Sequence, residues 1–162
     1  MINNKPKKPE AIEKEFIEKV IQVKRVSKKT KGGNQISFSA LVTVGNHHGK
    51  AGIGFAKAPD VVSSIQKALA KAKEHMVKIE IVNGTIAHEI YYKLGAAKII
   101  LRPAPVGTGV IAGGPIRAVV EAFGIQNLVS KRLGTSNKSA NIFATFEALE
   151  KIKPNTKKPE EN

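Results

Sequence analysis

The sequence contains no cysteine and no tryptophan, and it has only two tyrosines and six phenylalanines among 162 residues. The absence of cysteine excludes disulfide bridges, thiol nucleophiles and zinc–thiolate sites. With so few aromatic rings, the protein is poorly equipped to stack on single-stranded bases. No apolar run approaches the roughly 20 residues that cross a bilayer, and the polar N-terminus lacks a signal-peptide core. We therefore expect a cytoplasmic protein with no membrane association.

Motifs for catalysis and cofactor binding are also missing. The stretch from Gly107 to Pro115 is rich in glycine. It lacks the Lys-Ser or Lys-Thr pair of a P-loop and the spacing of a dinucleotide-binding fingerprint, so a nucleotide-binding enzyme is the weakest alternative. The adjacent His47 and His48 have neither a cysteine nor a nearby carboxylate to complete a metal site. We expect no catalytic residue, metal, cofactor or small-molecule substrate.

Positive charge dominates what is present. There are 27 Lys and Arg residues against 13 Asp and Glu residues, which gives a formal net charge of +14 and a pI near 10.0. Such a balance is typical of nucleic-acid-binding proteins, because each Lys or Arg placed on a phosphate releases a condensed counterion. Together with the shortage of aromatic rings, it predicts recognition of the backbone and shape of structured RNA.

The chain divides into two α+β domains with different sequence patterns, flanked by polar tails. The first pattern predicts three strands followed by a helix, and the second predicts the order ββαβα. The expected boundaries are 1–11 for a basic tail, 12–78 for the first domain, 79–85 for a linker, 86–153 for the second domain and 154–162 for a second tail.

In the first domain, a strand is predicted over Phe16 to Val26. Alternating apolar and polar residues from Ile36 to Val44 predict a half-buried second strand, and a third follows over Ala51 to Phe55. Asp60 is expected to cap a helix, in which apolar residues recur at three- and four-residue spacing as far as Met76. The order is therefore βββα.

In the second domain, Pro115 is expected in the first turn of a helix, and Gly124 is expected to end it in the left-handed conformation. Ser136 or Asn137 is expected to cap a last helix. Three segments rich in apolar residues are predicted strands: Ile86–Tyr92, Ala97–Arg102 and Ile125–Leu133.

A basic segment, from Lys24 to Asn34, connects the first two predicted strands. No acidic residue lies between Lys24 and Gln35, and a Gly-Gly pair allows close approach to another surface. We interpret the segment as a hairpin tip that enters folded RNA, rather than as a merely solvated turn. Lys67 and Lys71, on the exposed face of the predicted helix, are weaker RNA-binding candidates. The predicted rRNA-binding residues are Lys24, Arg25, Ser27, Lys28, Lys29, Lys31, Gly32, Gly33, Lys67 and Lys71.

Several of these segments resemble the ribosomal protein S5 family of the bacterial small subunit. The resemblance is carried by Val23–Lys28, Lys31–Gly33 and Phe38–Val42 in the first half, and by Gly107–Gly114 and Arg117–Val119 in the second. It extends over roughly Phe16 to Leu149, with the motifs in the family's order.

The resemblance implies a first domain similar to a double-stranded-RNA-binding domain without its leading helix, and a second domain with a left-handed βαβ crossover. It also implies binding to small-subunit rRNA, ribosomal proteins S4 and S8 as neighbours, proximity to mRNA at its entry channel, and an influence on decoding accuracy. Gly109, Gly113, Gly114 and Arg117 are its expected protein-partner face.

Three departures from the family pattern stand out. Asn34 replaces a frequent arginine, Pro115 replaces a small or flexible residue, and Lys138-Ser139 replaces a frequent Asn-Pro pair. The alternative function is a free-standing double-stranded-RNA-binding module or RNA chaperone, which would act away from the ribosome.

Overall fold

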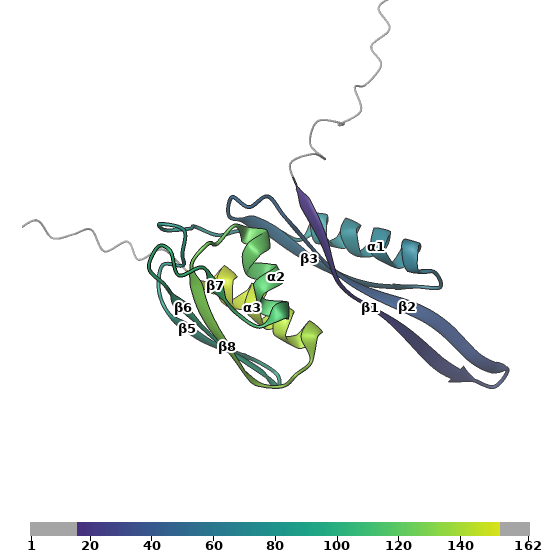
Figure 1. The fold of residues 1–162 in the computed structure, drawn as a ribbon. Coiled ribbons are helices and arrows are strands. Elements are labelled where there is room, and N and C mark those ends of the chain that lie inside the picture. The colour runs from purple at the N-terminus through teal and green to yellow at the C-terminus, as the bar shows by residue number, and fades with distance from the viewer. Residues whose placement is uncertain (1–15, 153–162) are drawn as a thin grey trace, which may run out of the picture.

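A computed structural model describes residues 16–152 of the chain (Figure 1). Both tails that the sequence predicts, 1–11 and 154–162, lie outside the described residues. The elements in chain order are β1 (Ile17–Thr30), β2 (Gly33–Gly45), β3 (Lys50–Ala58), α1 (Val61–Glu74), β4 (Met76–Lys78), β5 (Ile90–Leu94), β6 (Ala97–Pro103), β7 (Val110–Ile111), α2 (Gly114–Phe123), β8 (Leu128–Gly134) and α3 (Lys138–Lys151).

The N-terminal domain is an antiparallel sheet in the order β1-β2-β3-β4, with α1 on one face. The predicted βββα order is confirmed, and β4 adds a short fourth strand. Asp60 caps α1 as expected, because its carboxylate accepts a hydrogen bond from the Ser63 backbone N–H at 3.3 Å. The helix is shorter than predicted. It ends at Glu74, and Met76 belongs to β4, where it pairs with Gly52.

Helix α1 packs unusually close to the sheet, because small residues meet at the contact. Its buried line consists of Ser64, Ala68 and Ala72. Opposite them, Gly52 and Gly54 have no side chain, and a Cβ at either glycine would overlap a carbonyl oxygen of the helix. The backbone of α1 therefore rests directly on β3.

The C-terminal domain has the strand order β5-β6-β8-β7, with α2 and α3 packed against the sheet. Strand β7 pairs in parallel with β8, so that β7, α2 and β8 form a βαβ unit. The predicted ββαβα order is confirmed, with β7 as an additional short strand. Gly124 ends α2 in the left-handed conformation at φ 87°, and Asn137 caps α3 by accepting from the Ser139 N–H.

Two predicted strand boundaries in this domain are wrong. The first strand begins at Ile90 rather than at Ile86, and the third begins at Leu128 rather than at Ile125. In both cases the isoleucine at which the predicted strand begins, Ile86 or Ile125, is apolar and buried, but it lies in a loop that contributes to the core. Burial alone produces an apolar run, whatever the backbone conformation.

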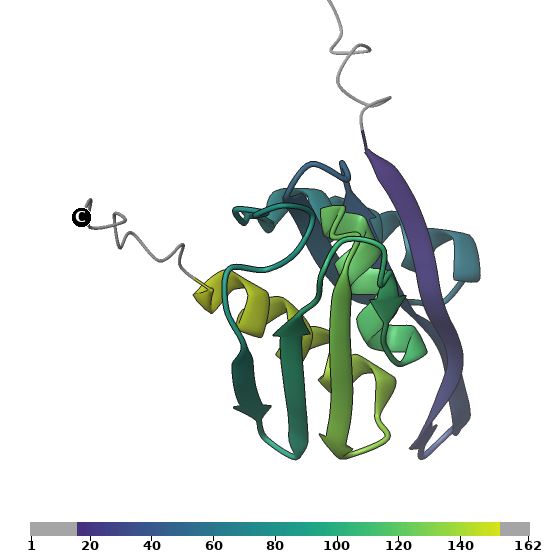
Figure 2. The same ribbon diagram turned by 60° about the vertical axis from the view of Figure 1, so that its left-hand side comes forward.

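One hydrophobic core is formed by residues of both domains, and a second one lies between α1 and the N-terminal sheet. The sequence predicts a half-buried β2, but in its central part both faces are buried: Leu41 and Thr43, 2% and 1% exposed, lie on one face, and Val42, 0% exposed, lies on the other. Helix α1 covers one face of the strand, and α2 of the other domain covers the opposite face (Figures 1 and 2). Backbone hydrogen bonds also cross the interface, including one of 2.7 Å from the Gly49 N–H to the Phe123 carbonyl.

Candidate RNA interface

A two-stranded arm extends from the N-terminal sheet (Figure 1). Pairing between β2 and β3 ends at Phe38 and Ala58, whereas β1 and β2 remain paired as far as Thr30 and Gly33. We call residues Val26–Ser37 the arm, because they pair only with each other. Five residues per strand give the arm a length of about 17 Å.

The tip of the arm is a tight turn. Lys31 and Gly32 connect the strands, and Gly33 has a positive φ of 130°. The Thr30 hydroxyl donates a 2.8 Å hydrogen bond to the Gly33 carbonyl and closes the turn. Neither Gly32 nor Gly33 has any other atom within 4 Å of the position that a Cβ would occupy. The tip is thus narrow and open to contact from outside.

Cations lie on both faces of this ribbon, because successive side chains in a strand point to opposite sides. Lys24 and Lys28 fall on one face, and Arg25 and Lys29 fall on the other. All four are exposed, and within residues 16–152 none of them forms a salt bridge. The arm therefore carries uncompensated positive charge that a polyanion can neutralise from either side.

The predicted RNA-binding residues fall into two places. Eight of them lie in or at the base of the arm: Lys24, Arg25, Ser27, Lys28, Lys29, Lys31, Gly32 and Gly33.

Lys67 and Lys71 are separate from the arm. Both are exposed on α1, which runs beside the paired part of the sheet (Figure 1). The ammonium group of Lys71 lies 3.5 Å from the Phe55 carbonyl oxygen, at the edge of the sheet. These two lysines extend the positive surface along the helix but do not contribute to the tip.

The glycine-rich stretch before α2 is held by a buried asparagine that the sequence analysis did not identify. Asn127 is 5% exposed, and its side-chain oxygen accepts hydrogen bonds from the backbone N–H groups of Gly107 at 3.1 Å and Gly109 at 3.0 Å. Both glycines have positive φ. The Asn127 side chain thus holds two backbone positions of the loop, which is also held by a backbone hydrogen bond from the Leu128 N–H to the Gly109 carbonyl, and no residue within the loop could have indicated the role of Asn127.

Replacing Asn127 by alanine is expected to release this loop. The change removes the acceptor of two backbone donors, so stability should fall by about 1–2 kcal/mol. The Gly107 and Gly109 amides should then exchange with solvent much faster, as measured by hydrogen exchange. Asn127→Asp is the matched control, because it keeps the acceptor oxygen; equal exchange rates in the wild-type and Asn127→Ala proteins would contradict this role.

Gly113 and Gly114, two residues of the expected partner face, have no steric reason to be glycine within the chain. Both are exposed, and a Cβ at either position would meet nothing within 4 Å. Neither has a positive φ. The structure therefore leaves an exposed backbone surface beside Ile111, which is 56% exposed.

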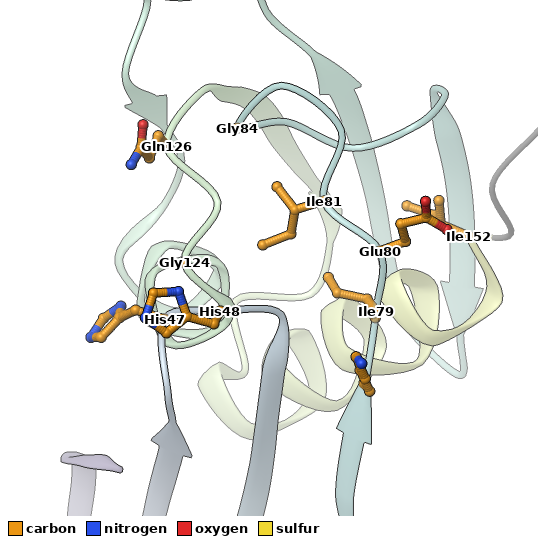
Figure 3. Close-up of a pocket in the computed structure, with 10 residues that line it drawn as sticks. His47, His48, Ile79, Glu80, Ile81, Gly84, Gly124, Gln126 and Ile152 are labelled. Carbon is orange, nitrogen blue, oxygen red and sulfur yellow. The ribbon is translucent and has the colours of Figure 1, made fainter. Parts of the chain in front are cut away.

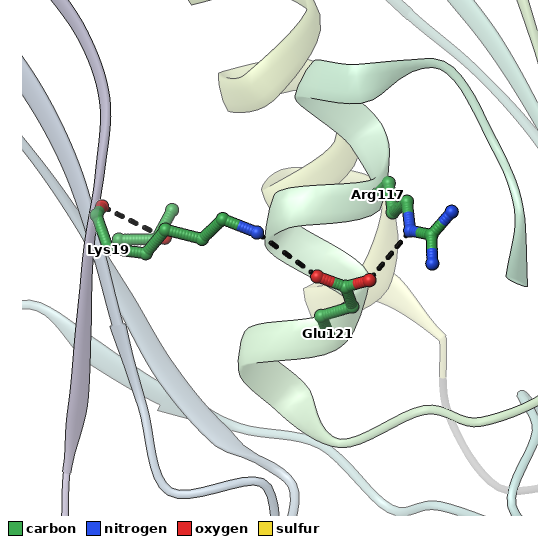
Figure 4. A network of polar contacts seen from close by, with 4 residues as sticks. Lys19, Arg117 and Glu121 are labelled. Carbon is green, nitrogen blue, oxygen red and sulfur yellow. Dashed lines mark hydrogen bonds and ion pairs between the residues drawn. The ribbon is translucent and has the colours of Figure 1, made fainter.

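Arg117, the fourth residue of that face, takes part in a link between the domains (Figure 4). Its Nε donates to the Glu121 carboxylate at 2.6 Å, and Lys19 of β1 donates to the other carboxylate oxygen at 3.2 Å. The bond from Arg117 lowers the pKa of Glu121 against the opposing effect of burial, and Lys19 lowers it further. The carboxylate thus stays ionised, and the rest of the exposed Arg117 guanidinium remains available to a partner.

A hollow of about 830 Å³ lies between the turn after β2 and the chain that links the domains (Figure 3). It is lined by His47, Glu80, Gln126 and apolar residues such as Ile81 and Ile152. The hollow is open to solvent, and in the part of the chain that the structure describes no three side chains are grouped to hold a metal. No helix within residues 16–152 could span a membrane.

Both halves of the chain match models of ribosomal protein domains. Residues 16–80 match the N-terminal domain of ribosomal protein S5, and residues 92–160 match its C-terminal domain.

Comparison with individual curated proteins leads to the same family as the domain models. The chain is similar to small ribosomal subunit protein uS5 of Thermotoga petrophila, at 47% identity over 85% of this chain and 78% of the relative. Similarity to the uS5 proteins of Thermosynechococcus vestitus (44% identity, 90% and 86%) and Magnetococcus marinus (46% identity, 95% and 89%) covers still more of each chain.

A basic two-domain α+β chain with these matches is a ribosomal protein, and its role is structural rather than enzymatic. It belongs to the ribosomal protein S5 family. Membership of the bacterial-type family, which the sequence motifs indicated, is confirmed.

Proposed function

We propose that this protein is a structural constituent of the cytoplasmic small ribosomal subunit, and that it binds small-subunit rRNA through the arm. The observation that carries the proposal is the exposed ribbon of Val26–Ser37, which presents on both faces cations that form no salt bridge within residues 16–152. Its shape suits a crevice of folded RNA, where phosphates surround the ribbon. Neutralising those phosphates releases counterions and drives binding.

The remaining rRNA contacts in the proposal lie at the base of the arm and along α1. Lys24 and Arg25 continue the arm towards the body of the protein, and Lys67 and Lys71 are exposed on the helix. Together these side chains would hold the protein against more than one segment of rRNA. Such bridging is how a protein of this size would support assembly of the subunit.

A second surface would contact a neighbouring protein. Gly109, Gly113, Gly114 and Arg117 lie at or beside the start of α2, where the backbone is exposed and the Asn127 bonds keep the loop in place. We assign this surface to ribosomal protein S4, with S8 as a further neighbour, at the mRNA entry channel. A change here would alter decoding accuracy, because it would shift an interface between two proteins next to mRNA.

We further propose that the first domain comprises residues 12–78 and the second domain residues 86–153, with residues 79–85 as the linker. The arm belongs to the first unit and the partner surface to the second. Rigid attachment of the two units through the shared core would keep the RNA-binding and protein-binding surfaces at a fixed spacing.

The proposal is tested by replacing Lys28, Lys29 and Lys31 with alanine in the full-length protein. Folding should be unaffected, because exposed charges contribute within about 0.5 kcal/mol each. Binding to transcribed small-subunit rRNA should weaken, and the slope of log K against log salt should become shallower by about 2, since each lost phosphate contact removes 0.7 to 0.9. Incorporation into small subunits should fall in parallel.

The matched control is a triple replacement of Lys50, Lys78 and Lys138, which removes the same charge elsewhere on the exposed surface. It should retain most of the affinity and of the salt slope. If the arm variant binds rRNA and assembles like the wild-type protein, the arm has no such role. If the wild-type protein sediments mostly away from small subunits, a free-standing double-stranded-RNA-binding module is favoured instead.

A further inference from the structure

The sheet of the C-terminal domain has one face that no other described part of the chain covers. Helices α2 and α3 pack on the inner face, and Figure 2 shows them behind the strands. Residues on the opposite side, which we call the outer face, follow from the pairing of β5, β6 and β8. Two adjacent rows cross it: Lys93–Lys98–Leu133 and Tyr91–Ile100–Lys131.

Three lysines are crowded on the outer face. Lys93 and Lys98 are directly opposite each other across β5 and β6, and such a pair has Cβ atoms about 5 Å apart. Lys98 is opposite Leu133, so Lys131 is its diagonal neighbour on β8, at about 7–8 Å. Like charges directly opposite each other, as in the Lys93–Lys98 pair, destabilise a sheet. The strand register thus places three positive charges close together on one face.

Negative charge is almost absent from this side of the sheet. The acid nearest to β5 along the chain is Glu89, which directly precedes the strand and forms a 3.0 Å salt bridge with Arg102. Among the salt bridges within residues 16–152, none involves Lys93, Lys98 or Lys131. The three ammonium groups are consequently available to an external ligand.

The remaining residues of the outer face indicate which ligand this is. Protein–protein interfaces are depleted in lysine at their centres, whereas here lysines occupy both central rows. Tyr91, two residues before Lys93 on the edge strand β5, is 56% exposed and offers a ring for stacking on a base or ribose. A flat sheet with cations and an exposed aromatic ring suits RNA better than a second protein.

We propose that the outer face is a second RNA-binding surface, at which Lys93, Lys98 and Lys131 neutralise backbone phosphates and Tyr91 stacks on the same strand. This inference rests on the proposed function for the identity of the RNA, but it concerns a surface on the other domain from the arm. The protein would then clamp rRNA with both domains.

The experiment compares four full-length proteins: wild type, the arm variant, the control variant, and a variant in which Lys93, Lys98 and Lys131 are replaced by glutamine. The control lysines are changed to glutamine for this comparison. Two of them, Lys50 and Lys78, are also cross-strand partners, so the geometry is matched. Equilibrium binding to transcribed small-subunit rRNA is measured across salt concentrations, and circular dichroism checks folding.

We expect the outer-face variant to lower the salt slope by about 2 and to melt no earlier than the wild-type protein, because repulsion between the lysines is removed. Tyr91→Ala should weaken binding without changing the slope. The inference would be overturned if the outer-face variant bound rRNA as tightly as the wild-type protein does. It would also be overturned if the control variant lost as much rRNA affinity as the outer-face variant. A loss of ribosomal-protein contacts with unchanged rRNA binding would make this a protein-binding face and would also overturn it.

These outcomes separate the inference from the proposed function. If only the arm variant loses affinity, the inference fails and the proposed function stands. If the wild-type protein itself shows no salt-dependent rRNA binding, the proposed function fails first.

Discussion

Gly54→Ala is expected to destabilise the protein by about 3 kcal/mol, near the upper end for overpacked sites. The added Cβ would overlap the Ala68 carbonyl oxygen and crowd the Ala72 backbone nitrogen. Backbone atoms within a helix cannot rotate away as a flexible side chain can, so α1 would have to lift from β3. The loss is a large fraction of the 5–15 kcal/mol that stabilises a typical domain. Urea unfolding followed by circular dichroism measures it.

Gly32→Ala is the matched control for this prediction. Gly32 is exposed in the turn of the arm, has no positive φ and has nothing within 4 Å of the Cβ position. Its replacement should leave the unfolding midpoint within experimental error. An unfolding midpoint for Gly54→Ala as high as that of Gly32→Ala would mean that α1 is not seated on the backbone of β3.

Gly124→Ala is expected to have a similarly large effect, about 3 kcal/mol, at the interface between the domains. Gly124 has a φ of 87°, and a Cβ there would overlap the carbonyl group of His47 in the turn after β2. Both the strain and the overlap act where the end of α2 packs against the turn after β2. Thermal unfolding should shift downwards, and the Gly49 amide, which donates to Phe123, should lose protection from hydrogen exchange.

Gly95→Ala separates the effect of backbone strain from the effect of steric overlap. Gly95 also has a positive φ, 57°, but its Cβ position is free of neighbours. Its replacement should cost only the conformational strain, about 1 kcal/mol. If Gly124→Ala costs no more than Gly95→Ala, the domains are not packed as closely at this point as the structure indicates.

The parts of the fold that the sequence predicted well are those determined by local chemistry. Strand alternation and the basic Gly-Gly turn located the β1–β2 hairpin, and the caps Asp60 and Asn137 located the starts of α1 and α3. Gly124 marked the end of α2 because a left-handed residue there favours glycine. Each of these signals acts over a few residues and needs no knowledge of tertiary structure.

The features that it missed depend on residues far apart in the chain. Polar Ser39 and Thr43 suggested a solvent-facing side of β2, yet they are buried, at 5% and 1% exposure, under the second domain. Asn127 bonds a loop that lies about 20 residues earlier in the chain. Strands β4 and β7 have only three and two residues, too few for a periodic pattern.

The outer face illustrates the same limit for the RNA-binding surfaces. Lys93, Lys98 and Lys131 are separated along the chain, and each is unremarkable in its own segment. Only the register of β5, β6 and β8 brings them together. The arm, by contrast, is continuous in sequence, so its charge could be read directly from the residue order.

The double burial of β2 also has a consequence for the nascent chain. Proteins emerge from the synthesising ribosome N-terminus first. When β1, β2 and β3 have emerged with α1, one side of their sheet is protected, but Leu41 and Ile53 on the other side still lack the helix that covers them. The newly made N-terminal half therefore exposes an apolar surface until α2 has been synthesised. A chaperone that binds apolar surfaces would bind it best during this interval.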